Sequence, residues 1–118
     1  MLPRKNRLKK KPEMDQIFRQ GSFLSFGFLA LKYVFKETPA PRLAFSIGTG
    51  YSPKATERNR AKRLLREAVK KNFDCLPKGI EGIFFVNKKK LPESKEQAEK
   101  ELPQLARLIL KKLAQRYS

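Results

Sequence analysis

The chain has 118 residues, 40% of them hydrophobic, which predicts a single folded domain covering residues 1–118. Lysine and arginine number 28 against 11 acidic residues, and the net charge of +17 indicates a polyanionic partner. Nucleic acid is the first hypothesis, with an anionic membrane and an unusually basic solvated surface as alternatives. Histidine is absent and Cys75 is the single cysteine, which excludes histidine-based acid–base catalysis, an internal disulfide and a zinc site.

The N-terminal region predicts a basic arm followed by a short helix. Residues 1–11 contain many cations and few apolar side chains, so we expect an extended or mobile arm. Pro12 suits the first position of a helix, and Gly21 can end it. One side of this predicted helix carries three apolar side chains, those of Met14, Ile17 and Phe18.

Two strands are predicted after this helix. Aromatic and aliphatic residues are dense from position 23 to 35, which predicts one strand with a bulge at Gly27. The segment 37–41 contains two prolines and predicts a turn. Residues 42–48 then predict a second major strand, because apolar side chains return after the turn.

A central helix and a buried strand are predicted next. Ser52 is the expected N-cap of the helix and Pro53 its first residue, and we expect the helix to end near Phe73. The short apolar run at 82–86 lies between glycine and lysine, which is typical of a buried strand.

The C-terminal tail predicts a further helix. Ser94 and Gln97 have the spacing of a capping box, and we expect Pro103 to kink the helix or divide it in two. The order of elements predicts an α+β fold of the α/β sandwich type. We expect a mixed central sheet of about four strands with three helices.

The central helix carries arginines where a helix disfavours cations. At about 100° per residue, one side forms an apolar stripe of Ala61, Leu64, Leu65, Ala68 and Val69. Arg58 and Arg60 lie at the two edges of this stripe, near the N-terminus of the helix. Each such cation costs on the order of 0.3–1 kcal/mol, whereas free N–H groups there favour phosphate. We interpret both arginines as phosphate contacts; pairing with Glu57 or exposure to solvent is the alternative.

The segment ERNRAKRLLREA at 57–68 is similar to the RNR signature of the protein subunit of bacterial ribonuclease P. The resemblance covers nearly the whole chain, because KNRLKK, IFRQG, FLALKY and IFFVNKK occur in the family's order. It implies that a left-handed crossover joins two parallel strands through the central helix, against the usual right-handed rule. It also implies an accessory subunit that helps a catalytic RNA remove the 5′ leader from precursor tRNA, with Mg²⁺ held mainly by the RNA.

The resemblance assigns contact residues to two RNA partners. Contacts to the catalytic RNA fall on the central helix, at Arg58, Asn59, Arg60, Lys62, Arg63 and Arg66. Contacts to the leader fall on Met14, Phe18, Lys32, Lys88 and Lys89. The N-terminal arm adds Arg4, Lys5 and Arg7. For Phe18 a place in the core is as good an alternative as stacking on an unpaired base.

Three positions depart from the family's pattern. Met14 stands where a second aromatic side chain is common, so stacking of a base there would be weaker or replaced by a contact through sulfur. The loop GTGYSP at 48–53 replaces one that commonly carries lysine, which leaves its part of the RNA contact open. Asn87 replaces a common arginine, and we expect the lysines at 88–90 to supply the charge.

Other functions are compatible with so basic a chain. A stand-alone structural RNA-binding protein, of the ribosomal or RNA-chaperone type, differs only in lacking the RNR context. The absence of histidine argues against an autonomous nuclease, and the core's need for the apolar stripe argues against a membrane-surface protein.

We therefore expect no catalytic residue, no metal site, no organic cofactor and no obligate protein partner. The lone cysteine and the lack of a signal or membrane-spanning segment predict a cytoplasmic protein.

Overall fold

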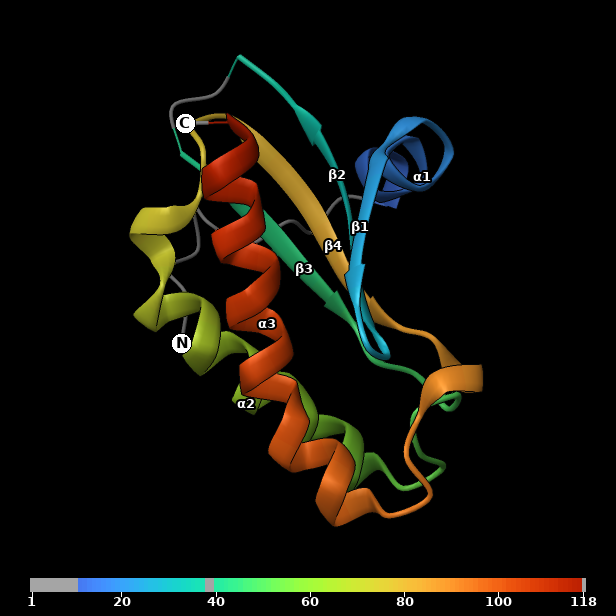
Figure 1. Cartoon of the computed structure of the whole chain (residues 1–118). Coiled ribbons are helices and arrows are strands. Elements are labelled where there is room, and N and C mark those ends of the chain that lie inside the picture. The colour runs from blue at the N-terminus through green and yellow to red at the C-terminus, as the bar shows by residue number, and fades with distance from the viewer. Residues whose placement is uncertain (1–10, 38–39, 118) are drawn as a thin grey trace.

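The computed structural model of the chain describes residues 11–37 and 40–117 (Figure 1). The described helices are α1 (Lys11–Gln20), α2 (Ala55–Lys71) and α3 (Lys95–Tyr117). The described strands are β1 (Ser22–Phe26), β2 (Leu29–Phe35), β3 (Arg42–Ser46) and β4 (Ile80–Val86). Two short 3₁₀ helices lie on either side of β4, η2 (Phe73–Cys75) and η3 (Lys88–Lys90).

The four strands form one mixed sheet in the order β1-β2-β4-β3. β1 pairs with β2 and β2 pairs with β4 in antiparallel fashion, while β3 and β4 are parallel neighbours. Because parallel neighbours need a crossover connection, α2 joins β3 to β4. The predicted α+β class, with a mixed sheet of four strands and three helices, is confirmed. The left hand of the crossover stays a prediction implied by the resemblance.

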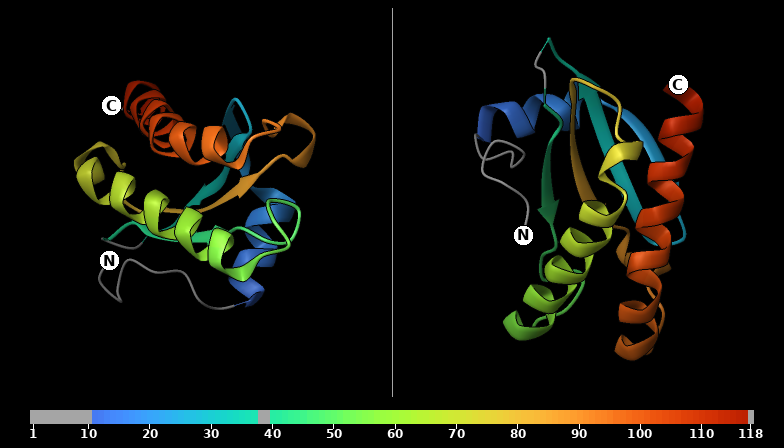
Figure 2. Two further views of the ribbon diagram at one scale, coloured as in Figure 1. Left: turned by 90° about the horizontal axis from the view of Figure 1, so that it is seen from below. Right: turned by 90° about the vertical axis from the view of Figure 1, so that its left-hand side faces the viewer.

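Helices cover both faces of the sheet. Figure 2 shows α2 and α3 side by side on one face and α1 on the other. Alternation along the strands follows this division: Leu43 and Phe84 belong to the large core under α2 and α3. Ala44 and Ile83 instead form a small core with Ile17 of α1. Since α1 has only ten residues, part of its face of the sheet stays open.

The predicted single strand at 23–35 is wrong, because the segment is a hairpin. β1 ends at Phe26, β2 begins at Leu29, and these two residues pair across a two-residue turn. Gly27 has a φ of 57°, the left-handed backbone that such a turn demands and that glycine adopts without strain. Gly27 is therefore a turn residue rather than a bulge. Neither turn residue, Gly27 or Phe28, is polar, and aromatic or aliphatic residues flank both, so the composition does not mark the turn.

The start of α2 also differs from the prediction. The helix begins at Ala55, with Lys54 in the N-cap position and no side-chain cap. The hydroxyl of Ser52 instead accepts the N–H of Lys54, 3.1 Å away, and donates to the carboxylate of Glu57. A serine that binds the N–H two residues on forms a local turn and delays the helix. The helix ends at Lys71, two residues before the predicted Phe73.

The remaining boundaries shift by a few residues. β3 ends at Ser46, two residues before the predicted end, and β4 begins at Ile80, two residues before the predicted start. The hydroxyl of Ser94 accepts the N–H of Gln97, 3.3 Å away, which confirms half of the capping box. The Gln97 side chain donates to Glu101 instead of returning to the cap.

Pro103 lies inside an uninterrupted α3, so the predicted division of this helix is wrong. Leu102 and Ala106, on either side of the proline, are both fully buried. Packing of the apolar face on the sheet and on α2 thus outweighs the loss of one helical N–H. A bend of α3 at Pro103 stays a prediction.

Candidate nucleic-acid interface

Polar side chains of α2 form a basic surface on the side away from the core. Ala61, Leu65, Ala68 and Val69 are buried, as the predicted stripe requires, whereas Leu64 is only half-buried. The opposite side of the helix opens into a hollow of about 580 Å³ lined by Asn59, Lys62, Arg63, Arg66 and Glu67. Four of the six residues predicted to contact the catalytic RNA therefore share one surface. We call these four residues the α2 basic face.

Arg66 is the member of the α2 basic face that is tied to the sheet. Its guanidinium carbon lies 5.7 Å from the centre of the Phe45 ring, within the range of a cation–π contact. Phe45 stacks on Phe84 with the ring planes 5° apart. Because this stack holds the aromatic partner in place, the charge of Arg66 is positioned next to β3 before any ligand arrives.

Arg58 is directed to the loop before the helix. Its Nη1 donates to the backbone oxygen of Ser52, 2.9 Å away, and its side chain is half-buried. Glu57 accepts from Ser52 and not from an arginine. The alternative that both arginines pair with Glu57 is therefore wrong. Arg58 stabilises the loop through this bond. None of the described contacts of Arg58 is to a carboxylate.

Arg60 lies between α2 and α3 instead of on the α2 basic face. Its Nη1 is 3.1 Å from a carboxylate oxygen of Glu99 in α3. The Arg60 side chain is nevertheless 57% exposed, and a surface ion pair of this kind contributes about 0–1 kcal/mol. The predicted set is thus divided between two sides of the helix, with Arg60 on the side facing α3.

The loop before α2 contains a buried tyrosine that the sequence patterns did not single out. Tyr51 is 1% exposed, and its hydroxyl has no hydrogen-bond partner among the described residues. Burial raises the pKa of Tyr51 to about 12, and the charge of Glu99 adds to the effect. The Lys95 ammonium lies 4.4 Å from the centre of the Tyr51 ring and donates to its backbone oxygen. A single tyrosine in a loop with two glycines gives no sequence signal that it is buried and packed against Lys95.

The open part of the face covered by α1 carries exposed aromatic rings. Phe18 is 37% exposed, so its place on the surface excludes the core alternative. The Phe18 ring meets the Phe85 ring of β4 edge-on, with the centroids 5.9 Å apart. The Phe23 ring of β1 lies against the Phe85 ring as well, with the centroids 6.2 Å apart. Lys32 donates from Nζ to the backbone oxygen of Phe18, 2.7 Å away, and so holds the end of α1 on β2.

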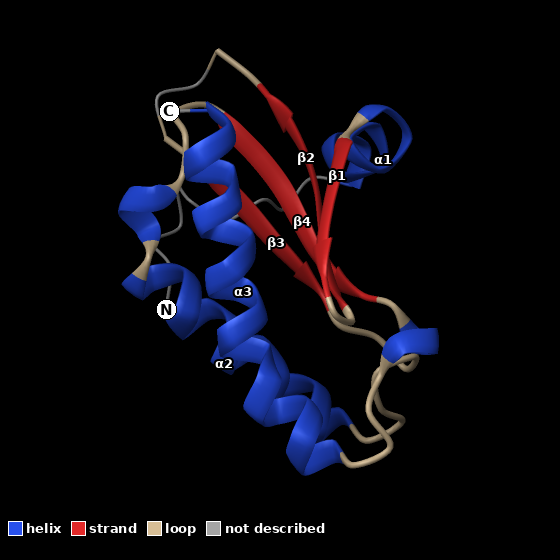
Figure 3. Cartoon of the chain, in the orientation of Figure 1, coloured by secondary structure: helices blue, strands red, loops and turns tan. Residues whose placement is uncertain are grey.

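A second hollow of about 350 Å³ extends from these rings to η3. Its lining includes Phe23, Phe85, Asn87, Lys88 and Lys90. The Asn87 side chain accepts the N–H of Lys89, 3.1 Å away, and thereby caps η3. Figure 3 shows that the β1–β2 turn, the loop before α2 and η3 lie at the same end of the sheet. We call the exposed rings and this hollow the sheet hollow.

The structure divides the predicted leader contacts. Phe18, Lys32 and Lys88 lie on or beside the sheet hollow, whereas Lys89 is exposed and does not line it. Met14 is half-buried and packs on the small core of Ile17, Ala44 and Ile83. The aromatic members Phe23 and Phe85 were missed; the pairing of Phe23 with Lys32 across the hairpin could have revealed the first of them. Arg4, Lys5 and Arg7 lie outside the described residues.

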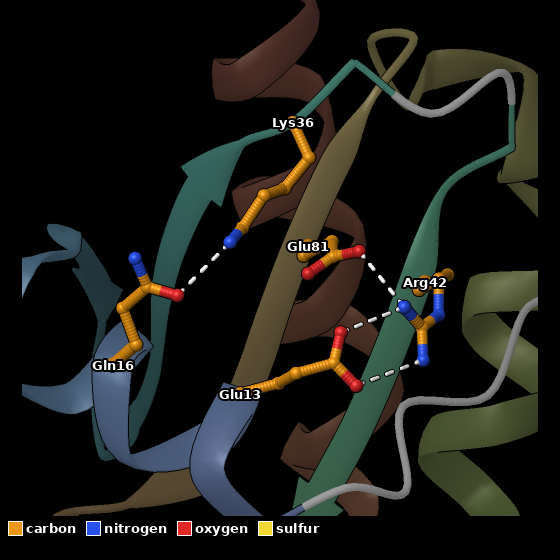
Figure 4. Close-up of polar contacts among 5 residues, drawn as sticks. All are labelled: Glu13, Gln16, Lys36, Arg42 and Glu81. Atoms are coloured by element: carbon orange, nitrogen blue, oxygen red, sulfur yellow. Dashed lines mark hydrogen bonds and ion pairs between the residues drawn. The ribbon is translucent and has the colours of Figure 1, made fainter.

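A partly buried ion-pair cluster attaches α1 to the sheet (Figure 4). Arg42 of β3 donates to both carboxylate oxygens of Glu13, at 2.9 and 3.3 Å, and to Glu81 at 3.1 Å. Glu81 is 1% exposed, and the bond to Glu13 is the largest cause of the raised pKa of Arg42. Lys36 donates to Gln16 beside the cluster, 2.9 Å away. Because these contacts fix the first turns of α1, they also fix where Phe18 lies at its far end.

Comparisons with known proteins assign the family. The family model described as Ribonuclease P matches residues 2–110. The chain belongs to the ribonuclease P family. It is 35% identical over 85 residues to the ribonuclease P protein component of Chlorobaculum tepidum, covering 67% of this chain and 55% of that relative. The Thermotoga petrophila component is 30% identical over 96 residues, covering 81% of this chain and 80% of the relative.

Solved ribonuclease P proteins share the fold. The RNase P protein of Thermotoga maritima superimposes with a TM-score of 0.70 at 22% identity, covering 95% of this chain and 97% of that one. The family-model match and the curated relatives confirm the predicted family, and the stand-alone RNA-binding alternative is not favoured. The chain spans just over half the length of the Chlorobaculum tepidum relative.

Acidic and cysteine side chains of this ribonuclease P family chain do not gather into a larger cluster among the described residues. No group of three or more aspartate, glutamate or cysteine side chains lies together among residues 11–37 and 40–117. The carboxylates of Glu13 and Glu81 both pair with the Arg42 guanidinium, which supplies the positive charge that a metal ion would otherwise supply there. In addition, no described helix is long and apolar enough to cross a membrane.

Proposed function

We propose that this chain is the RNA-binding protein subunit of a ribonuclease P, which helps the catalytic RNA remove the 5′ leader from precursor tRNA. The observation that carries the proposal is the α2 basic face, where three cations and Asn59 surround one hollow with Glu67 as its only acid. Guanidinium forks match phosphate oxygens bidentately, and an amide can donate and accept at sugar or base edges. The family membership supports the same assignment.

The second part of the proposal assigns the leader to the sheet hollow. Phe18 and Phe23 expose ring surface on which unpaired bases can stack, and Lys88 and Lys90 line the same region. Stacking of a base on an aromatic ring contributes about 1–3 kcal/mol and tolerates any sequence. A single-stranded leader suits this surface, and mature tRNA lacks that segment. The protein would therefore favour precursor over mature tRNA.

The proposed mechanism is electrostatic and positional. Two RNA molecules repel each other, and a chain of net charge +17 between them lowers that repulsion. The α2 basic face and the sheet hollow lie on different faces of the sheet, so one chain can contact both RNAs at once. The bond-breaking groups belong to the RNA in this proposal. We assign Mg²⁺ to the RNA, because no group of three or more carboxylate or cysteine side chains lies together among the described residues. The proposed role of the chain requires no metal ion of its own.

The proposal also places the protein in the cytoplasm, in keeping with a single free cysteine and a tRNA substrate. Cleavage at limiting Mg²⁺ tests the function as a whole. A purified ribonuclease P RNA should cleave precursor tRNA much faster with the chain than without it, because added cations lower the metal requirement. A stand-alone RNA-binding protein would leave the rate unchanged, and cleavage by the chain without RNA would contradict the assignment of the chemistry to RNA.

A further inference from the structure

An aromatic cluster lies at the end of the sheet opposite the α2 N-terminus and η3. It joins the last residues of β2 to the last turn of α3, near the C-terminus in Figure 1. Tyr33 is buried at the base of the cluster, while Phe35 and Tyr117 are 44% and 41% exposed. The centroids of the Phe35 and Tyr117 rings are 4.7 Å apart. The proposed function uses none of these side chains.

The cluster is held in a fixed geometry. The hydroxyls of Tyr33 and Tyr117 are 2.9 Å apart, and Nη1 of Arg116 donates to the Tyr33 hydroxyl at 3.2 Å. The Tyr33 ring also meets both exposed rings edge-on, with centroids 5.9 Å apart in each case. Attachment of α3 to the sheet accounts for the buried Tyr33. It does not account for two large rings that keep more than a third of their surface exposed.

The charge around the cluster selects the kind of partner. From Leu102 to Tyr117, α3 contains four cations and no carboxylate: Arg107, Lys111, Lys112 and Arg116. Arg116 is exposed and has no ion pair with the described carboxylates. Cations suit the C-terminus of a helix in any protein, but exposed rings beside an unpaired guanidinium also match a base and its phosphate. A second copy of this chain would bring the same positive charge and be repelled.

We propose that Phe35 and Tyr117 form a stacking site for an unpaired RNA base, with Arg116 binding the adjoining phosphate. The site lies at the α3 side of the sheet, whereas the sheet hollow lies on the face of α1, so the two would contact different stretches of RNA. It does not depend on leader recognition. A chain that failed to stimulate precursor cleavage could still bind single-stranded RNA here.

The absence of tryptophan from the chain permits a direct test. Phe35→Trp places the only tryptophan in the cluster, and Leu108→Trp serves as the matched control. Leu108 is 43% exposed on α3, and nine residues of helix place it on the side opposite Tyr117. The probe is a short oligoadenylate, added to the full chain while tryptophan emission is recorded.

We expect oligoadenylate to quench the emission of the Phe35→Trp chain at least twice as strongly as that of the control. Arg116→Gln, introduced into the Phe35→Trp chain, should weaken the oligoadenylate binding that this quenching measures. It should also reduce the slope of log affinity against log salt concentration by about 0.7, the value for one phosphate of a single strand. Equal quenching in both chains, or none, would overturn the proposal. Burial of the new tryptophan at rising protein concentration without RNA would also overturn it, in favour of self-association. If the Phe35→Trp chain does not fold, Tyr117→Trp serves as the reporter in the same cluster.

Discussion

The guanidinium of Arg60 lies 3.1 Å from the carboxylate of Glu99, so the RNR segment holds one of its own arginines against α3. These residues are 39 positions apart and belong to different helices. The pair is exposed on the Arg60 side, and its contribution of about 0–1 kcal/mol is small compared with a charge-assisted bond to phosphate. Glu99 therefore orients Arg60 in the free protein, and under the proposed function it would compete with RNA for this arginine.

Glu99→Gln should raise the affinity of the chain for the ribonuclease P RNA. Loss of a competing carboxylate that contributes up to about 1 kcal/mol corresponds to an increase of up to about fivefold. Glu96→Gln is the control, because Glu96 is exposed on the same helix and removes the same charge without touching Arg60. Binding titrations at fixed salt measure both. An equal gain from the two variants, or a loss with Glu99→Gln, would show that Arg60 does not exchange partners.

Phe18→Ala should weaken binding of precursor tRNA to the assembled enzyme and spare mature tRNA. Loss of one stacked base at about 1–3 kcal/mol predicts a decrease of about fivefold to 150-fold for the precursor alone. The ring is 37% exposed and rests on Phe85, so the substitution leaves the large core intact. Leu108→Ala removes a comparable exposed apolar side chain from α3 and should alter neither affinity. Equal losses for both tRNAs would contradict leader stacking.

Tyr51→Phe should change how stability depends on alkaline pH. The folded pKa of about 12 lies above the ordinary value near 10, so between these values the folded state binds more protons than the unfolded state. Stability therefore falls as pH rises through this window. The variant lacks the ionising group and should lose less stability from pH 9 to 11.5. At neutral pH it should be no less stable, because the hydroxyl has no described partner. Urea unfolding at each pH measures the difference; parallel curves would mean that Tyr51 titrates normally.

The sequence predicts those features that depend on local periodicity. Ala61, Leu65 and Val69 were expected to be buried and are, because a 3.6-residue period places them on one side of a helix. The same period places the α2 basic face opposite them. The charges of that face are also compatible with an ordinary solvated helix surface. Only the family resemblance predicted that the face binds RNA.

Features that depend on contacts between distant residues were not predictable. The turn at Gly27 and Phe28 has no polar residue to mark it, and the strand pattern at 42–48 does not indicate the partners of Arg42. The Arg42 bonds to Glu13 and Glu81 arise only when α1 packs on the sheet. The same holds for Arg60 and Glu99: both helices expose several charges, and only their packing decides which two meet. Placement of α1 then determines that Phe18 lies on the surface.

The salt dependence of binding to the ribonuclease P RNA tests the central claim that the α2 basic face neutralises RNA phosphates. Arg63→Gln with Arg66→Gln is compared with Lys100→Gln with Lys111→Gln, which removes the same charge from exposed positions on α3. The account predicts weaker binding and a log–log slope reduced by about 1.4–1.8 for the α2 pair alone, because each lost phosphate contact contributes about 0.7–0.9. An unchanged slope for the α2 pair, or the same reduction in both chains, would contradict it.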